Sequence, residues 1–213
     1  MQKKRWVWLG VAALAIVIVI VAVFGIRALR VEFWDYGFDR DVSEPERQLR
    51  LEFVSSAEKW LGTCEGSQEH KDILAIYNNF KPLAQGYTVK DEDNWCATYV
   101  STVAIECNLT GIIPTECGCQ RQIGLFQELG RWEESDDYTP LPGDIIYYCG
   151  GDKDPFSDCT GWSDHVGIVV GSCNGYLKVI EGNCNNRVAY RYIRVNSTGI
   201  RGFALPEYDT ITE

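Results

Sequence analysis

The sequence predicts an α+β domain in which N-terminal helices pack on an antiparallel β-sheet, preceded by one transmembrane helix. Three observations support this fold class. Residues 6–26 carry no charge, apolar residues recur at helical spacing between residues 43 and 130, and β-rich runs separated by Gly, Asn, Asp and Ser follow Pro140 and Pro142. Helices that come first and strands that follow are typical of α+β domains.

Residues 1–30 have the composition of a membrane anchor. The uncharged stretch Trp6–Ile26 is 21 residues long, enough to cross the hydrocarbon core of a bilayer. The apolar region of a cleaved signal peptide is shorter, roughly 7–15 residues, and small residues precede its cleavage site. The segment "AVFGIRALR", residues 22–30, instead ends in bulky and basic residues. We therefore expect an uncleaved signal anchor, with a cleaved signal peptide as the alternative, and a single-pass cell-membrane protein whose folded domain is extracytoplasmic.

The rest of the chain is strongly acidic. Residues 1–30 contain five of the 20 Lys and Arg residues and none of the 30 Asp and Glu residues. The remainder therefore has 15 basic and 30 acidic groups, a formal net charge of −15. Nucleic acids are bound through basic surfaces, so we expect no nucleic-acid partner, and membrane contact only through residues 6–26.

The elements follow in order along the chain. Residues 31–61 are predicted to form a juxtamembrane tether and a first helix, for which Ser43 and Glu46 fit a capping box. A second helix begins after the capping residue Ser67. Helices two to four are expected over 67–79, 94–107 and 120–129. Strands are expected over 144–149, 165–171, 176–182, 187–195 and 200–206.

The stretch "NWCATYVS" places Cys96 where a nucleophile would benefit. Asn94 or Asp93 is expected to cap the helix, so that Cys96 lies in its first turn, where the helix dipole lowers the pKa of a thiol. The free N–H groups there can also bind an oxyanion. Histidine suits the accompanying proton transfer near neutral pH. Of the two histidines, His70 is explained by a solvated helix face, whereas His165 opens a strand and can face the helix start across a cleft.

The next strand can supply a third residue. A hairpin through the Asn-Gly pair at 174–175 returns the chain to His165, so that Glu181 or Asn183 can orient the imidazole. A strict two-residue turn, however, would place Glu181 and Asn183 on the face opposite to His165. The triad therefore requires a loop with an odd number of residues or a β-bulge. Two glycines are candidates for the bulge: Gly171 and Gly182.

Five motifs in order, "NWCATYVS", "GDIIYY", "DHVGIVV", "IEGN" and "GFALPEY", resemble the CHAP family of cysteine, histidine-dependent amidohydrolases/peptidases. The resemblance covers residues 62–208, which leaves 209–213 as a tail. It implies a papain-like fold and a bacterial hydrolase that cleaves an amide of peptidoglycan, either between muramic acid and L-alanine or within the stem or crossbridge peptides. The catalytic residues that it implies are Cys96 as nucleophile, His165 as base and acid, Glu181 as orienting residue and Asn183 as polar partner.

The resemblance also assigns residues outside the catalytic group. Gly143 and Asp144 match a structural motif before a core strand, so no chemistry is assigned to Asp144.

The acidic loop 152–158 is expected to be solvated rather than to bind Ca²⁺, because an EF-hand-type site also needs a glycine turn and a distal bidentate acid. We predict no metal and no cofactor. Four aromatic residues are candidates to line a cleft for a sugar or stem peptide: Tyr87, Trp95, Trp132 and Trp162.

All nine cysteines follow the predicted anchor, which fits an oxidising compartment. A zinc site is the less favoured alternative, since the two cysteines of "CGC" lack the usual spacing of paired ligands. We expect Cys96 to stay reduced and at least two disulfides to form among the other eight cysteines. The nearest candidates are Cys149 with Cys159, and Cys107 with Cys117 or Cys119.

Two alternative functions stay open. One is an NlpC-type cell-wall endopeptidase, whose third residue is commonly a histidine; the single usable histidine of this chain favours CHAP. The other belongs to a different class, a catalytically inactive, disulfide-stapled module that binds the cell wall or a partner. Peptidoglycan is the expected partner in each hydrolase interpretation, and the sequence names no partner in secretion or division machinery.

Overall fold

A computed structural model describes residues 37–38, 40–135, 137–149 and 158–211, which belong to one folded unit spanning residues 36–213. The predicted anchor at residues 6–26 lies outside the described residues, as do Asp152 and Asp154 of the acidic loop. Within the described ranges, no helix has both the length and the apolar character needed to cross a membrane.

The element order confirms the α+β class. The helices are α2 (Glu44–Glu58), α3 (Gln68–Asn79), α4 (Cys96–Glu106) and α5 (Cys119–Glu128), with short 3₁₀ helices η1 (Ala84–Gly86) and η2 (Tyr208–Ile211). The strands are β1 (Trp132–Glu133), β2 (Ile145–Tyr148), β3 (His165–Cys173), β4 (Tyr176–Glu181), β5 (Ala189–Arg194) and β6 (Ile200–Ala204). They form one antiparallel six-stranded sheet in the order β1-β6-β2-β3-β4-β5. The two-residue strand β1 was not predicted.

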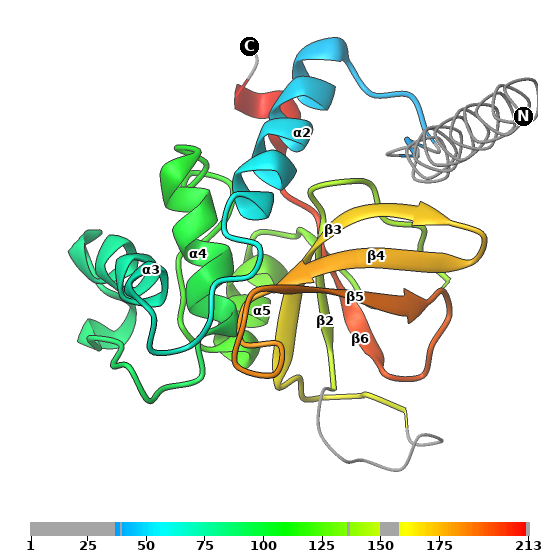
Figure 1. Ribbon diagram of the computed structural model, residues 1–213. Coiled ribbons are helices and arrows are strands. Elements are labelled where there is room, and N and C mark those ends of the chain that lie inside the picture. Colours follow the sequence, from blue (N-terminus) through cyan, green and yellow to red (C-terminus); the bar gives the residue numbers. More distant parts are fainter. Residues whose placement is uncertain (1–36, 39, 136, 150–157, 212–213) are drawn as a thin grey trace, which may run out of the picture. The chain divides into compact units, whose positions relative to one another are not determined.

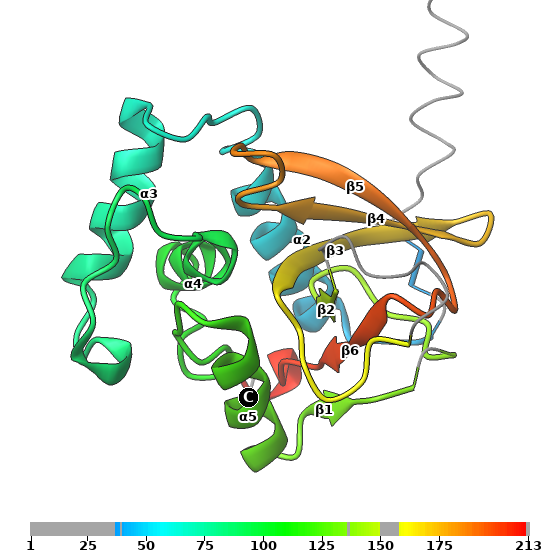
Figure 2. The same cartoon turned by 90° about the horizontal axis from the view of Figure 1, so that it is seen from below.

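The helices α3, α4 and α5 lie together on one side of the sheet, as both views show (Figures 1 and 2). The main hydrophobic core fills this interface and includes Tyr147, Ile168 and Ile180 from neighbouring strands. A second cluster, with Val169 and Val179, covers the opposite face of the sheet. Helix α4 is buried around most of its circumference, since every residue from 96 to 104 is buried. The first turn of α4 is therefore held by packing on several sides.

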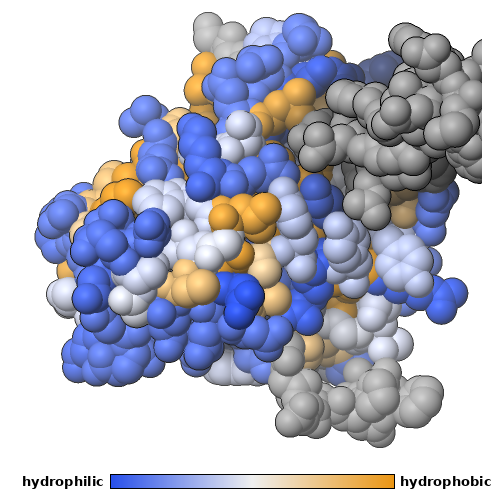
Figure 3. All heavy atoms as spheres, viewed as in Figure 1, coloured by the Kyte–Doolittle hydropathy of each residue, from blue (hydrophilic) through white to orange (hydrophobic). Residues whose placement is uncertain are grey.

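One face of the surface mixes hydrophilic and hydrophobic residues (Figure 3). On the face shown in Figure 3, hydrophobic residues form small groups that are separated by hydrophilic ones. Single exposed apolar residues are normal on a soluble domain, so this face gives no sign of a broad apolar contact.

The predicted caps of the first two helices are confirmed. The hydroxyl groups of Ser43 and Ser67 each accept a hydrogen bond of 3.2 Å from the backbone N–H three residues later. Asp144 is fully buried and accepts hydrogen bonds from Arg50 of α2 (2.8 Å) and from the N–H of Leu141 (2.9 Å). These contacts tie α2 to the start of β2, which agrees with a structural role for Asp144.

The hairpin between β3 and β4 has a two-residue turn. Cys173 opposes Tyr176, and the turn residues Asn174 and Gly175 have φ angles of 51° and 78°. Positive φ at both central residues is what a type I′ hairpin turn requires, and Asn-Gly is its preferred pair. With this two-residue turn, His165 and Glu181 can share a face of the sheet only if the hairpin contains a β-bulge.

The bulge is present. The pairing of β3 with β4 shifts by one residue between Val169 and Gly171, so Val170 is the extra residue. Of the two glycine candidates, Gly171 lies beside this shift. Beyond the bulge, Ile168 opposes Ile180, and continuing that register places His165 and Glu181 on the same face of the sheet.

The cysteines differ from expectation in one respect. Cys149 and Cys159 are joined by a disulfide with a Cα–Cα distance of 5.8 Å. The other seven cysteines, all within the described ranges, are free, so the expected second disulfide is wrong. The reason is their placement: Cys107 lies at the end of α4, whereas Cys119 contacts Cys96 at its start.

Candidate active site

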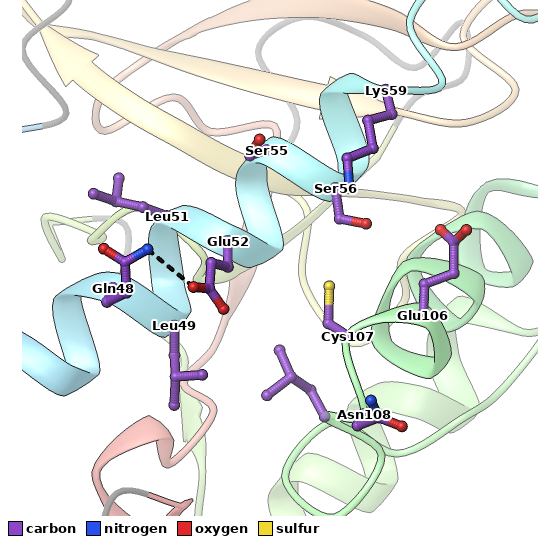
Figure 4. Close-up of a pocket in the computed structure, with 11 residues that line it drawn as sticks. Gln48, Leu49, Leu51, Glu52, Ser55, Ser56, Lys59, Glu106, Cys107 and Asn108 are labelled. Carbon is purple, nitrogen blue, oxygen red and sulfur yellow. Dashed lines mark hydrogen bonds between the residues drawn. The ribbon is translucent and has the colours of Figure 1, made fainter.

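Two pockets in the described part of the chain are each lined by at least one free cysteine. One, of about 600 Å³, lies between α2 and the end of α4 and contains Cys107, whose thiol lies near Ser56 (Figure 4). Within the described residues, no histidine interacts with the Cys107 thiol. The other, of about 510 Å³, is lined by Cys96, whose thiol is hydrogen-bonded to His165. A thiol that acts as a nucleophile needs a proton-transfer partner, so the second pocket is the candidate site.

The start of α4 is fixed by aromatic packing. Trp95 occupies the N-cap position and no side chain caps the helix, so the predicted cap by Asn94 or Asp93 is wrong. The Asp93 carboxylate instead accepts hydrogen bonds from the backbone N–H of Lys90 and the hydroxyl of Tyr87, both at 2.8 Å. Without a side-chain cap, the first N–H groups of α4 remain able to bind a ligand or the Cys96 sulfur.

A glycine lets α4 approach the end of β4. A Cβ added at Gly182 would lie 2.5 Å from the Cβ and 2.8 Å from the Cγ of Tyr99, closer than real Cβ atoms come to a neighbouring atom. The residue after Glu181 must therefore be small for Cys96 and Glu181 to belong to one site. This gives a packing reason for the glycine of "IEGN".

His70 is not on a solvated face, which corrects the prediction. Its side chain is fully buried, its ring packs 4.7 Å from that of Trp95, and its Nδ1 accepts a hydrogen bond from the N–H of Gly66. Burial lowers the pKa of His70. The packing partner Trp95 comes from a different element, so helical periodicity alone did not reveal this burial.

His165 is held by a carboxylate. Its Nε2 lies 2.9 Å from Oε2 of Glu181, whose side chain is fully buried. Glu181 also accepts hydrogen bonds from Nε of Arg191 at 2.7 Å and from the hydroxyl of Tyr148. The Tyr148 ring packs against the imidazole with centroids 5.2 Å apart. Since Nε2 is engaged by Glu181, Nδ1 is the nitrogen left to face the Cys96 thiol.

Space for the carboxylate comes from Gly167. A Cβ added there would lie 2.4 Å from Cγ1 of Val179 and 3.2 Å from Cγ of Glu181. Any larger residue would displace Val179 or Glu181, so the glycine of "DHVG" keeps the Glu181 carboxylate in reach of His165.

Sequence reasoning missed three contacts of the site: Tyr148, Arg191 and Cys119. Tyr148 is the last residue of the recognised "GDIIYY" motif but was given no role, and alternation along β2 would have placed it on the face opposite to Tyr147. Arg191 lies on β5, whose register depends on the irregular loop after Glu181. For Cys119, no local signal indicated that its helix begins against Cys96.

The electrostatics favour a thiolate–imidazolium pair. A hydrogen bond with Cys119 lowers the pKa of Cys96, burial opposes this, and hydrogen bonding and charge from His165 together with the Ala97 N–H bring the pKa to about 5. Burial acts to lower the pKa of His165, but its interactions with Cys96 and Glu181 raise it to about 9. For Glu181, burial is outweighed by the hydrogen bonds from His165, Tyr148 and Arg191, so its pKa is lowered. The pair is therefore ionised between about pH 5 and about pH 9.

Asn183 contacts the cysteine side of the site rather than His165. Its Nδ2 donates a hydrogen bond of 3.1 Å to Oδ1 of Asn94, two residues before Cys96. This contact connects the end of β4 with the start of α4. The prediction of Asn183 as a nearby polar partner thus gains a specific contact, although the imidazole is oriented by Glu181.

The four aromatic candidates are placed differently. Trp162 is 56% exposed and lines the Cys96 pocket. Trp95 is fully buried, so its prediction as a substrate-lining residue is wrong, because it packs beneath the helix start. Trp132 packs on Tyr147, with centroids 5.5 Å apart, and Tyr87 is 41% exposed beside Asp93; neither lines the Cys96 pocket.

Alkylation of Cys96 should show the lowered pKa. With a pKa of about 5, the thiolate predominates at pH 6, and His165→Ala should slow alkylation at that pH roughly 10-fold or more, since each pKa unit changes the thiolate fraction tenfold. Cleavage after Glu92 and Glu106 isolates a peptide in which Cys96 is the single cysteine, so mass spectrometry can follow this site alone. Equal rates at pH 6 would show that His165 does not activate the thiol.

A thiol at a helix start, beside a histidine held by a buried carboxylate on an antiparallel sheet, is the arrangement of cysteine-dependent hydrolases. Residues 86–183 match the family model of the CHAP domain, in agreement with the resemblance that the motifs indicated. Members of the family are in general amidohydrolases or peptidases.

Two solved structures are similar to the chain. They are entitled "The crystal structure of Ly7917", with a TM-score of 0.41, and "The crystal structure of Ly7917 with the hydrolyzing product of MDP", with a TM-score of 0.43. Each is 12% identical over 74% of this chain, and the match spans 62% of their own length. No curated protein matches the chain.

Proposed function

We propose that the domain hydrolyses an amide bond of peptidoglycan, as an N-acetylmuramoyl-L-alanine amidase or a stem or crossbridge endopeptidase. The CHAP family supports peptidoglycan as the substrate. The observation that carries the chemistry is the combination of Cys96 at the start of α4 with the His165–Glu181 pair at 2.9 Å. Glu181 occupies the place of the third residue, which favours this mechanism over the NlpC type with its histidine.

The first half of the reaction forms an acyl-enzyme. The Cys96 thiolate attacks the carbonyl carbon of the scissile amide, and the uncapped N–H groups of α4 stabilise the developing oxyanion. The imidazolium of His165 gives its proton to the nitrogen, the carbon–nitrogen bond breaks, and the amine leaves. Glu181 keeps the imidazole oriented and stabilises its charged form throughout.

The second half releases the acid. Neutral His165 takes a proton from a water molecule as that water attacks the thioester carbon, and the bond to Cys96 breaks. The exposed ring of Trp162 at the pocket rim is a surface on which a sugar or a stem peptide can pack.

We also propose that residues 6–26 anchor the protein in the cell membrane with the CHAP domain outside the cytoplasm. The uncharged stretch supports the anchor, and the Cys149–Cys159 disulfide fits an oxidising compartment. Fractionation of cells that produce the chain, followed by protease treatment of intact cells or spheroplasts, tests both points. A soluble cytoplasmic chain would contradict them.

Digestion of purified peptidoglycan by the full-length chain tests the function. We expect new amino groups, detected by mass spectrometry, and no new reducing sugar ends. A new N-terminal L-alanine would identify the muramoyl amidase, and any other new amine an endopeptidase. New reducing ends would instead indicate a glycosidase and contradict the proposal. Binding to peptidoglycan without any product would favour the inactive binding module.

A further inference from the structure

A second thiol contacts the proposed nucleophile. The Sγ of Cys119 lies 3.5 Å from the Sγ of Cys96. Each cysteine is the first residue of its helix, so the starts of α5 and α4 converge on the two sulfurs. Only 7% of Cys119 and 4% of Cys96 is exposed, yet both line the same pocket. A small reagent that reaches one sulfur therefore also reaches the other.

The hydrolytic mechanism does not require this second thiol. Attack, proton transfer and orientation are accounted for by Cys96, His165 and Glu181. Cys119 does lower the pKa of Cys96 through a hydrogen bond, but a serine hydroxyl could donate the same bond without any risk of oxidation beside a reactive thiolate. The proposed function therefore does not explain why this residue of the "CGC" motif is a thiol.

We propose that Cys119 is the resolving thiol of a reversible disulfide with Cys96, and that this redox site switches the enzyme off. The bond itself follows from the sulfur geometry, whereas the switching effect rests on the proposed hydrolase function. In the oxidised form Cys96 has no free thiolate, so the amide carbonyl cannot be attacked. Reduction restores the nucleophile.

A hydroperoxide is the oxidant that this chemistry uses. The Cys96 thiolate attacks one peroxide oxygen, the oxygen–oxygen bond breaks, and Cys96 becomes a sulfenic acid while hydroxide leaves and is protonated. The Cys119 sulfur then attacks the sulfenic sulfur, the sulfur–oxygen bond breaks, and water leaves with the Cys119 proton. Two thiols are oxidised by two electrons in total, and one hydrogen peroxide is reduced to two waters.

Oxidation of Cys96 should lower the pKa of Cys119, which favours the attack of Cys119 on the sulfenic sulfur. In the resting site, the hydrogen bond with Cys96, burial and the Cys96 charge raise the pKa of Cys119. A sulfenic acid at Cys96 is neutral, so its formation removes that charge and the pKa of Cys119 falls. The two sulfurs then have to approach by about 1.5 Å to reach a disulfide length of about 2.05 Å, which side-chain rotation can supply.

Peptide mapping of the full-length chain tests the bond without using peptidoglycan. The protein is treated with a few equivalents of hydrogen peroxide, its free thiols are alkylated, and it is cleaved on the carboxyl side of glutamate without reductant. Cleavage at Glu106 and Glu116 separates the Cys96 peptide from the peptide that contains Cys117 and Cys119. We expect these two peptides to be joined, two hydrogens lighter than their sum.

Two matched variants identify the partner. Cys119→Ser should lose the joined peptides and accumulate sulfinic acid at Cys96, whereas Cys117→Ser should keep them. Dithiothreitol should restore most of the lost hydrolysis in the wild type and in Cys117→Ser, but less than about a tenth of it in Cys119→Ser, because sulfinic acid is not reduced by thiols.

Several results would overturn the redox proposal. Wild-type Cys96 converted directly to sulfinic acid, or peptides still joined in Cys119→Ser, would exclude Cys119 as the resolving thiol. The wild-type mapping needs no variant and no substrate, so it remains decisive if a variant fails to fold, because fragmentation of the joined peptides places the bond at Cys119 or at Cys117. Joined peptides in a chain that never cleaves peptidoglycan would uphold the redox site and reject the hydrolase function.

Discussion

Replacing Cys96 with serine should reduce the release of amines from peptidoglycan by roughly 10³-fold or more. Loss of a nucleophile that acts as part of a triad commonly costs far more than the loss of a binding contact. The hydroxyl group has a pKa far above that of a thiol, so the ionised pair with His165 that exists between about pH 5 and about pH 9 cannot form. Initial rates on purified peptidoglycan measure the effect.

The matched control is the same substitution in the other cysteine pocket. Cys107 lies between α2 and the end of α4, where burial raises the pKa of its thiol. Cys107→Ser should leave the rate within about twofold of the wild type, because this side chain does not line the Cys96 pocket. Retained activity in Cys96→Ser, or an equal loss in both variants, would contradict the assignment of the nucleophile.

Glu181→Gln should lower kcat/KM roughly 10²–10⁴-fold, and Glu181→Ala should in addition lower the free energy of unfolding by about 3–5 kcal/mol. Glutamine cannot stabilise the imidazolium of His165 and it removes the charge that faces Arg191. Alanine leaves the Tyr148 hydroxyl and the imidazole without their common acceptor. Initial rates and urea unfolding measure the two effects.

The stability effect should depend on pH in a defined direction. The folded-state pKa of Glu181 is lowered, so its contribution to stability is present above the unfolded value of about 4.3 and is lost as pH falls through the folded-state value. The stability difference between wild type and Glu181→Ala should therefore shrink below about pH 4.3. Glu128→Gln, at an exposed position of α5, is the control and should change stability by less than about 0.5 kcal/mol. A difference that does not vary with pH would show that the Glu181 charge is not stabilising.

Local patterns in the sequence were sufficient to predict most elements and the polar residues of the site. The caps Ser43 and Ser67, the Asn-Gly turn and the alternation of β4 are each specified by neighbouring residues, so single-sequence reasoning finds them. The need for a bulge also followed from counting residues along the hairpin. These features depend on distances of a few residues along the chain.

The features that were missed depend on contacts between distant segments. The sequence predicted that His70 lies on a solvated helix face and that Trp95 lines a substrate cleft. In the structure the two rings pack on each other beneath α4. Arg191 reaches Glu181 through a strand whose register is set by an irregular loop. Cys119 meets Cys96 because two helix starts converge, and nothing in either local sequence encodes that approach.

The extra residue at Val170 has a consequence for how this hairpin can vary. In an uninterrupted hairpin with a two-residue turn, facing residues have numbers of opposite parity, so two odd-numbered residues such as His165 and Glu181 could never share a side. One added residue reverses this rule for every pair of facing residues between the bulge and the open end of the hairpin. Insertions or deletions of two residues at the tip would therefore preserve the histidine–carboxylate pair. A change of one residue would separate it, unless a second irregularity restored the count.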